Sequence, residues 1–566
     1  MTQTSGAIGQ TSEVKQSKDT KQQSTLVQRV QRLVPYISST WLLCILIGAI
    51  ALGFNLYRLG SPSIWFDEAF SVELARQPLP LIWHIIWGPE PNMELYYLLL
   101  HFWLGFTGFL GLHPTEFVVR FPSAICAALS SVMVFLLGRR FLGITAGIVG
   151  AGLYLLNDLQ LTYAQQTRSY SLQLLLICIA WYALFTILSQ SSHYKRWWVC
   201  YIAVTTLAIY THLFTLVILL AQLTAYVGLL ILPGTWRATA RKQLPAFIVS
   251  LVCISLLSIP MLLVSRHGSK TGWLPSPHLH DVYNLFLNIS ANSKIYMLLL
   301  FGFCALGILM IVLTRLTLNH EGTASEPGAT QASPPSINST PAPTRTMLLR
   351  QEVAFALLCW FVVPIVFSYV VSQGSTRLFS TRYLVTILPA LFLLVGLGVA
   401  SLRWRAAQVV LTLVLFLVAL YYVPTYYRGA QIEDWNSTVL WLQQHYQPGD
   451  GLVCYDSDVE QGCQVSVEYY LHAYPSAAHF TGYSPGEFSW TNFGPADSHS
   501  GPEAAVDPGA LAAYASQHPN IFYITGRIPN DAAAARAKAA QHWFDTHYFL
   551  RGRIVTPTVT ISLYAP

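Results

Sequence analysis

Charged residues are scarce in this sequence. Only 10% of the 566 residues are Asp, Glu, Lys or Arg, whereas 53% are hydrophobic. A soluble chain of this length carries far more charge, so the composition excludes an ordinary globular protein and predicts a polytopic membrane protein. The net charge of +6 does not indicate nucleic acid, because the basic residues fall in short clusters between apolar runs and form no continuous stripe.

Cysteine is sparse too, and seven of the nine thiols lie in or beside apolar runs, where they behave as small hydrophobes. Cys454 and Cys463 are different, because they lie nine residues apart in a polar region. The two can form a disulfide if this region is outside the cell, but sequence alone does not settle the pairing.

The N-terminal residues 1–35 lack the apolar segment of a cleavable signal and are rich in Gln, Ser, Thr and Lys. They have too little apolar surface to fold alone, so we expect a disordered tail, which its basic residues place in the cytoplasm. The first span, Tyr36–Tyr57, then serves as the anchor.

About eleven apolar segments are expected to cross the membrane if basic clusters in short loops are cytoplasmic. Arg139 and Arg140 lie inside only if Leu95–Leu112 does not cross, so we expect that stretch to form a juxtamembrane or re-entrant helix. An odd number of spans places the C-terminal region outside. The spans are Tyr36–Tyr57, Phe117–Leu137, Leu142–Asn157, Tyr170–Leu188, Trp197–Tyr210, Leu213–Leu232, Leu244–Val264, Lys294–Leu313, Glu352–Val371, Tyr383–Ala400 and Ala406–Val423.

The chain thus divides into the tail 1–35, a transmembrane domain 36–424 with an outer loop 58–94, and an extracytoplasmic domain 425–566. A Pro/Ser/Thr-rich stretch, 319–345, is a cytoplasmic linker inside the second part. The last part alternates helix and strand patterns, which predicts a small α/β domain. Its expected elements are helices Asp434–Tyr446 and Asp531–Tyr548 and strands Gly451–Tyr455, Ile521–Thr525 and Val555–Leu563. It shows no metal-ligand spacing, Gly-rich phosphate loop or nucleophile elbow, so we expect a lid or an acceptor-binding cap.

Four acidic residues gather directly after the first span: Asp67, Glu68, Glu90 and Glu94. Carboxylates beside a membrane cost free energy unless they meet water, a cation or a substrate. The neighbouring tryptophans and tyrosines suit the boundary between lipid and water. We therefore predict an active-site loop at the membrane surface with Asp67 as its base; the alternative is an ordinary interfacial loop with solvated acids.

The expected topology places further polar residues on the same outer face. They are Asp158, Tyr163, Gln165, Gln166, Arg168, His212, Arg266, His267, Lys270, Arg377, Arg382 and Tyr383. Early carboxylates with later guanidinium groups suit transfer of a sugar from a lipid-linked phosphate. The leaving phosphate needs charge neutralisation by arginine, whereas the acceptor hydroxyl needs a carboxylate base. A single base and a single displacement imply inversion at the anomeric carbon.

Several segments resemble the polyprenyl-phosphate-sugar-dependent glycosyltransferases of the GT-C fold, the group of protein O-mannosyltransferases and aminoarabinose transferases (family 39 and relatives). The similar segments are WFDEAFS (65–71), ELYYLLLHFW (94–103), RFPSAICAALSSVMVFLLGRRFLG (120–143), YAQQTRSYSL (163–172), IYTHLF (209–214) and RYLVTILPA (382–390). The resemblance implies a GT-C membrane domain and Asp67 as the catalytic aspartate. It also places Arg168 and Arg382 in segments that line the donor-phosphate pocket. The chain departs from the family pattern at Glu94, where proline is expected, and at Gln166, where an acid is common.

Each candidate residue also has a plain structural interpretation. Asp67 and Glu94 can be helix starts, and Glu68 lies about 100° from Asp67 on a helix, so both need not face one site. Asp158 can be a turn former, and an arginine at the outer edge of a span can snorkel. The predicted site comprises Asp67, Glu68 and Glu94 as catalytic residues, Arg168, Arg382, Tyr383 and His212 around the donor phosphate, and Asp158 toward an acceptor or metal.

We therefore expect an inverting transferase that moves a mannose-like hexose from a polyprenyl-phosphate donor to an acceptor hydroxyl of protein, lipid or glycan at the outer membrane face. A transporter or flippase of lipid-linked sugars is the alternative, although the span interiors carry few ionisable groups for ion coupling. A non-catalytic receptor is a third interpretation. No cofactor is required by the sequence, and a divalent cation is left open.

Overall fold

The computed structural model describes residues 39–88, 90, 92–189, 194–265, 274–323, 343–454, 461–480, 482, 489–492, 507–526 and 531–566. The predicted tail 1–35, most of the linker and the outer-loop residues Arg266, His267 and Lys270 lie outside these ranges. The linker is shorter than predicted, because helix α13 continues to Thr323 and α14 begins at Pro343.

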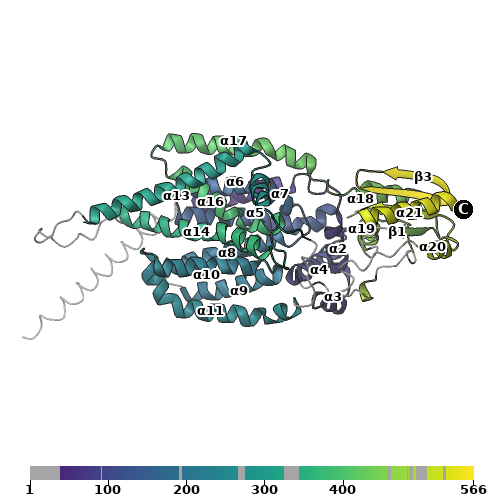
Figure 1. The fold of residues 1–566 in the computed structure, drawn as a ribbon, viewed down its shortest axis with the longest axis horizontal. Helices are drawn as coiled ribbons and strands as arrows, with labels where there is room; N and C mark the ends of the chain where they lie inside the picture. Colours follow the sequence, from purple (N-terminus) through teal and green to yellow (C-terminus); the bar gives the residue numbers. More distant parts are fainter. Residues whose placement is uncertain are drawn as a thin grey trace, which may run out of the picture.

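Long apolar helices form the membrane part (Figure 1). Among the described residues, eight helices are long and apolar enough to cross a bilayer, or nine if a bent pair counts as one span. The eight are Ser39–Leu56, α5 (Glu116–Phe141), α8 (Tyr170–Leu188), α11 (Trp236–Val264), α13 (Lys294–Thr323), α14 (Pro343–Val371), α17 (Arg405–Gly429), and α15 (Thr381–Leu384) continuing through the 3-10 turn η1 (Val385–Ile387) into α16 (Leu388–Ala400).

The eleven predicted spans all fall on helices, but three of them miss the length and hydropathy requirement as single helices. α9 (Tyr194–Thr211) is not among the eight, and α10 (Thr215–Ile231) is apolar but shorter. The predicted span Leu142–Asn157 is interrupted, because α6 (Ile144–Leu155) gives way to α7 (Asp158–Ala164) at a bend of 62°. Asn157 stabilises the new helix by accepting a hydrogen bond from the backbone N–H of Gln160.

The span formed by α15 and α16 lies at the centre of the bundle, where 94% of an 18-residue window within it is buried. It is apolar on every side, as a helix without a lipid-facing or water-facing surface is expected to be. Glycines allow its neighbours to approach closely: Gly396 packs against the backbone of Ala146 in α6, and Gly398 packs against the Phe303 carbonyl in α13.

The predicted outer loop 58–94 contains two helices, α2 (Phe66–Arg76) and α3 (Leu79–Ile86), and α4 (Glu94–Phe109) begins at its last residue. α4 is not among the helices long and apolar enough to cross, in agreement with the predicted juxtamembrane helix. Figure 1 shows these helices between the bundle and the C-terminal domain. Helix α12 (Leu279–Ile289) is a further short helix between two spans.

The C-terminal region is the predicted small α/β domain. Its sheet has the order β1-β2-β4-β3, with β1 and β2 parallel and the other two pairs antiparallel. The strands are β1 (Gly451–Cys454), β2 (Ile521–Gly526), β3 (Phe549–Val555) and β4 (Val559–Ala565); the helices are α18 (Trp435–His445), α19 (Gln461–Ala473), α20 (Pro508–Ala515), α21 (Asp531–His547) and the 3-10 turn η2 (Trp490–Asn492).

The predicted strand Val555–Leu563 is wrong in its bounds. The chain turns near the start of this stretch, where Thr556 and Val559 exchange hydrogen bonds; Val555 ends β3, and the residues from Val559 onward form β4 of the same hairpin. The alternation of side chains continued across the turn and concealed it. Helices α19 and α20 were not predicted.

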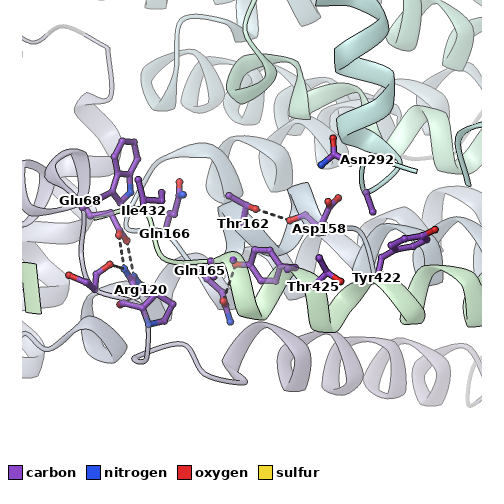
Figure 2. Close-up of a pocket in the computed structure, with 17 residues that line it drawn as sticks. Glu68, Arg120, Asp158, Thr162, Gln165, Gln166, Asn292, Tyr422, Thr425 and Ile432 are labelled. Carbon is purple, nitrogen blue, oxygen red and sulfur yellow. Dashed lines mark hydrogen bonds and ion pairs between the residues drawn. The ribbon is translucent and has the colours of Figure 1, made fainter. Parts of the chain in front are cut away.

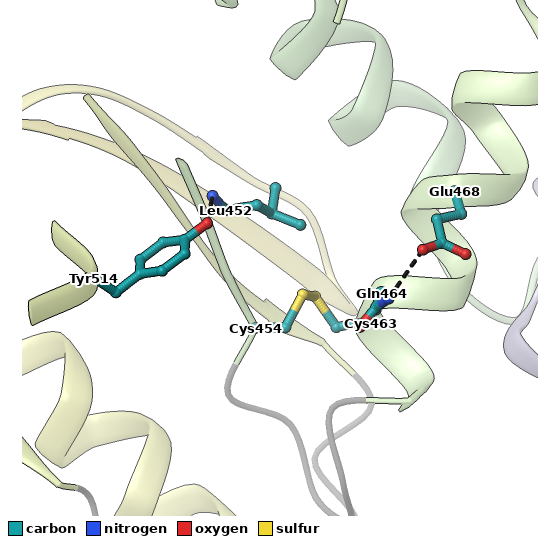
Figure 3. Close-up of a disulfide and its surroundings, with 6 residues drawn as sticks. All are labelled: Leu452, Cys454, Cys463, Gln464, Glu468 and Tyr514. Carbon is teal, nitrogen blue, oxygen red and sulfur yellow. Dashed lines mark hydrogen bonds between the residues drawn. A yellow bond between two sulfur atoms is a disulfide. The ribbon is translucent and has the colours of Figure 1, made fainter. Parts of the chain in front are cut away.

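A disulfide joins Cys454, the last residue of β1, to Cys463 in α19 (Figure 3). Both residues are buried. The bond ties the sheet to the helix that lies nearest the acidic loop, and it is the pair that the sequence left open.

Replacing both Cys454 and Cys463 with alanine is expected to lower the free energy of unfolding of the C-terminal domain by about 2–3 kcal/mol. The loss is no larger because a disulfide that closes a short loop restricts the unfolded chain less than one that closes a long loop. Thermal unfolding of the purified protein measures this loss. Cys253→Ala, which removes a free thiol from α11, serves as the control. An unchanged midpoint in the double variant, with both thiols reactive in the unreduced native protein, would contradict the bond.

Candidate active site

Asp67 lies at the start of α2, one residue after the helix begins. Its Oδ2 atom is 3.8 Å from Nη2 of Arg168 and 3.5 Å from Nη1 of Arg382. The three side chains are 16%, 11% and 29% exposed, respectively. The structure thus brings the early acid and the two later guanidinium groups together in one partly open group, which we call the Asp67 cluster.

Arg168 is held in the cluster by α2. Its Nη1 donates hydrogen bonds to the Asp67 carbonyl and to Ser71 Oγ, both at 3.1 Å. Burial opposes the charge of this guanidinium, but the nearby Asp67 carboxylate outweighs it and keeps the pKa of Arg168 above its ordinary value. Its Nε is buried and has no hydrogen-bond partner among the described residues. Arg168 is therefore fully charged and keeps one N–H donor unused.

His212 is buried in the turn between α9 and α10, beside the cluster. Its ring packs against Tyr170 and Tyr383, with centroids 5.6 and 5.1 Å away. Burial and the two guanidinium groups lower the pKa of His212 to about 3, so the imidazole is neutral. Its Nδ1 accepts a hydrogen bond from the Phe214 backbone N–H at 3.1 Å, which places the proton on Nε2.

Aromatic rings continue from His212 as a wall beside the cluster. Tyr163 packs on Tyr170 with centroids 4.7 Å apart, and Phe214 stacks on Tyr383 at 5.7 Å. Tyr383 and His212, both predicted at the donor phosphate, are thus neighbours of Arg382. Tyr170 was not singled out from the sequence; its position two residues after Arg168, as the first residue of α8, is the signal that marks it.

Glu68 faces away from the cluster and is fully buried. Both of its oxygens accept hydrogen bonds from Arg120, Nε to Oε1 at 2.9 Å and Nη2 to Oε2 at 2.7 Å, and Oε1 also accepts the Thr167 backbone N–H at 2.6 Å. A carboxylate with both oxygens occupied and no exposure is poorly placed to take a proton from a substrate. The geometry therefore does not support the predicted direct catalytic role of Glu68 and instead indicates a positioning role.

Arg120 is the residue that sequence reasoning missed. Besides Glu68, it donates to the carbonyls of Leu59, Pro62 and Ser63 at 2.7–3.0 Å. An arginine four residues into an otherwise apolar span needs a buried acid or a set of carbonyls as partner, and this requirement was the available signal.

Glu94 is the first residue of α4 and is buried. Its Oε2 has no hydrogen-bond partner among the described residues. Burial, with a smaller contribution from the charge of Glu90, raises the pKa of Glu94 to about 8. The hydroxyl of Tyr97, one turn further, is within electrostatic reach of both Glu94 and Asp67, and burial with these charges raises its pKa. Glu94 is thus a largely protonated acid near the cluster.

Asp158 lies in a separate cavity of about 250 Å³. Figure 2 shows the Glu68–Arg120 pair at one end of this cavity and Asp158 with Tyr422 at the other. Among the described residues, the lining includes no member of the Asp67 cluster. The structure therefore does not bring Asp158 to Asp67, and its predicted part toward an acceptor or metal stays a prediction. Gln166, the departure from the family pattern, also lines this cavity.

The residues around Asp67 do not fit a metal ion. In the described part of the chain, no three His, Cys, Asp or Glu side chains are grouped to hold one. The Asp67 carboxylate faces two guanidinium groups, which are not metal ligands. We therefore assign no step of a reaction to a divalent cation. Arg377 is also outside the cluster, because it binds the carbonyls of Ser372 and Gly374.

Part of this chain is similar in sequence to a known protein family, and its fold is similar to that of solved structures. Residues 98–262 match the family described as dolichyl-phosphate-mannose-protein mannosyltransferase. No curated protein matches the chain in sequence.

Two solved structures of ArnT from Cupriavidus metallidurans are similar over nearly the whole chain. The apo structure has a TM-score of 0.54 at 13% identity and covers 93% of this chain and 98% of ArnT. The structure bound to undecaprenyl phosphate has a TM-score of 0.53 at 12% identity, with coverages of 92% and 97%. The chain is therefore a polytopic membrane protein with the GT-C glycosyltransferase fold.

Proposed function

We propose that this protein transfers a mannose-like hexose from a polyprenyl-phosphate sugar to an acceptor hydroxyl, with inversion at the anomeric carbon. The observation that carries the proposal is the Asp67 cluster, in which one carboxylate faces two guanidinium groups at 3.5 and 3.8 Å. Two positive charges and one negative charge leave the cluster net positive, which favours an anionic phosphate. The similarity to ArnT solved with undecaprenyl phosphate supports a lipid-linked donor.

The spacing of the cluster suits entry of a phosphate. Charge-assisted hydrogen bonds are typically about 2.7–2.9 Å long, so the contacts of Asp67 with the arginines are loose. A donor phosphate would bind Arg168 and Arg382 more closely and release the carboxylate. Neutral His212 then offers the phosphate an N–H donor from Nε2 and adds no charge, while the aromatic wall gives the sugar or the lipid an apolar surface.

The reaction is a single displacement. Asp67 takes the proton from the acceptor hydroxyl as its oxygen attacks the anomeric carbon. The bond between that carbon and the phosphate oxygen breaks, and its electron pair leaves with the polyprenyl phosphate. Arg168 and Arg382 neutralise this leaving group, so no general acid is needed. Attack opposite the leaving group inverts the anomeric centre.

The acceptor side faces away from the cytoplasm in this proposal. A disulfide joins Cys454 and Cys463 in the C-terminal domain, and such bonds persist in oxidising compartments. The same domain packs against α2, because His472 Nδ1 lies 2.9 Å from Glu73 Oε2. The cluster is therefore on the side of the disulfide, where a protein, lipid or glycan acceptor is encountered.

Asp67→Asn is expected to lower turnover by about 10²–10⁴-fold, because the amide cannot accept the acceptor's proton. The assay incubates purified protein with a panel of polyprenyl-phosphate hexoses and follows release of polyprenyl phosphate. Donor affinity should survive, since both arginines remain. Asp281→Asn, which removes the partly exposed carboxylate of the α12 capping box, is the matched control. Full turnover by Asp67→Asn would refute the assignment, and lipid movement without sugar consumption would favour a flippase.

Arg382→Gln is expected to weaken donor binding at least about tenfold and to slow the leaving-group step, because one of two phosphate-neutralising charges is lost. Arg382→Lys should recover part of the affinity, since it keeps the charge but not the planar fork. Arg377→Gln changes the same outer loop away from the cluster and is the control. Equal losses in both glutamine variants would show that the loop, and not the phosphate contact, is responsible.

Glu94 predicts a pH dependence of stability. Its folded pKa of about 8 lies above the ordinary 4.5, so the folded protein holds a proton that the unfolded chain releases. Its contribution is full below about pH 4.5 and is lost as the pH rises to about 8 and beyond. Glu94→Gln should match the wild type at pH 5 and have the higher thermal midpoint at pH 9. A constant difference across this range, as expected for the control Asp281→Asn, would contradict the raised pKa.

A further inference from the structure

We infer that the C-terminal domain positions the catalytic helix, and that Glu433 and Tyr470 are positioning residues for Asp67. The inference rests on the proposed function of Asp67 as the base. The sequence predicted a lid or an acceptor-binding cap; here the domain has a further role, because it accepts hydrogen bonds from backbone N–H groups at and directly before the start of α2.

The N-terminus of α2 has no cap of its own. The first N–H groups of a helix lack partners within the helix, and the side chain of Trp65 at the cap position supplies none. Glu433 Oε2, which comes from the segment before α18, accepts the Phe66 backbone N–H at 2.9 Å. The same oxygen accepts Trp435 Nε1 at 2.7 Å, and Glu433 is buried. A carboxylate at this helix end is also favoured by the helix dipole.

Tyr470 holds the two residues before Trp65, which are Ser63 and Ile64. Its hydroxyl accepts the Ile64 backbone N–H at 2.8 Å and lies 2.9 Å from Ser63 Oγ. It donates to Glu116 Oε1 at 3.1 Å, which anchors it to the first turn of α5. In addition, the Asn436 backbone N–H donates to Ser63 Oγ at 3.0 Å. Residues 63, 64 and 66 are therefore each held by the C-terminal domain, directly before Asp67.

The consequence is control over where the Asp67 carboxylate lies. Productive proton transfer needs a base held within about 0.5 Å of its place, and a misplacement of about 1 Å can cost 10²-fold in rate. Arg120 holds the same segment from the membrane side through the carbonyls of Pro62 and Ser63. The domain holds it from the opposite side through N–H groups. Loss of either set leaves the helix start free to shift relative to Arg168 and Arg382.

The test compares Glu433→Ala and Tyr470→Phe with two matched controls in the full-length protein. Asp507→Ala removes an equivalent carboxylate cap, the one on the Gly509 N–H of α20, far from α2. Tyr523→Phe removes a buried hydroxyl that bonds the Ala537 carbonyl inside the domain. The readouts are kcat and KM for a polyprenyl-phosphate hexose and hydrogen exchange of the backbone amides of residues 63–70.

Glu433→Ala and Tyr470→Phe are expected to lower kcat by about 10- to 100-fold, with KM for the donor within about twofold, and to speed exchange at residues 63–70. Glu433→Gln keeps an oxygen that can accept the Phe66 N–H, so it should recover much of kcat. The controls should leave both readouts unchanged.

Control-like kcat in both variants overturns the inference, and so does faster exchange with unchanged kcat, because the domain would then hold the loop without guiding catalysis. Failure of the proposed function gives a different pattern. In that case Asp67→Asn keeps its turnover, while the exchange measurements still report whether the domain fixes the start of α2.

Discussion

The buried pair of Glu68 and Arg120 is the constraint on which the outer site depends. Arg120 is fixed in α5, and its guanidinium binds Glu68 together with three carbonyls of the chain that leads into α2. Removing one partner of such a pair leaves an uncompensated buried charge, which costs about 3–5 kcal/mol. The pair therefore decides where the first loop leaves the membrane and how α2 is oriented.

From this anchor, the electrostatics of the site follow step by step. Glu68 neutralises the charge of Arg120, whereas Arg168 and Arg382 lie 3.8 and 3.5 Å from the Asp67 carboxylate. Burial and, to a smaller extent, the positive charge of these two guanidinium groups lower the pKa of His212, so its imidazole stays neutral. Glu94 is buried, which raises its pKa to about 8, so this carboxyl group holds its proton at neutral pH. Neighbouring ionisable groups thus differ in protonation because their surroundings differ, as is common where proton transfer and anion binding share one site.

Much of the membrane part could be predicted from the sequence, because hydropathy and loop charge act locally. All eleven predicted spans fall on helices, eight of which are long and apolar enough to cross as single helices, and α4 is not one of these. The break after α6 depends on a cap at Asn157, and the hairpin of β3 and β4 depends on a turn that side-chain alternation conceals. The meeting of Asp67, Arg168 and Arg382 followed from placing them on one face. The pairing of Glu68 with Arg120 did not, because an acid's partner is set by packing of distant segments.

The adjacent acids Asp67 and Glu68 show why two carboxylates are needed where one reaction needs one base. Consecutive helix residues point about 100° apart, so one acid can face the open cluster only if the other faces inward. The inward acid is stabilised by Arg120 and, through it, fixes the rotation of α2. The outward acid then meets two guanidinium groups without being locked to either. Exchanging the two positions would bury the proposed base and expose the anchor, so the two acids have different surroundings although they are chemically alike.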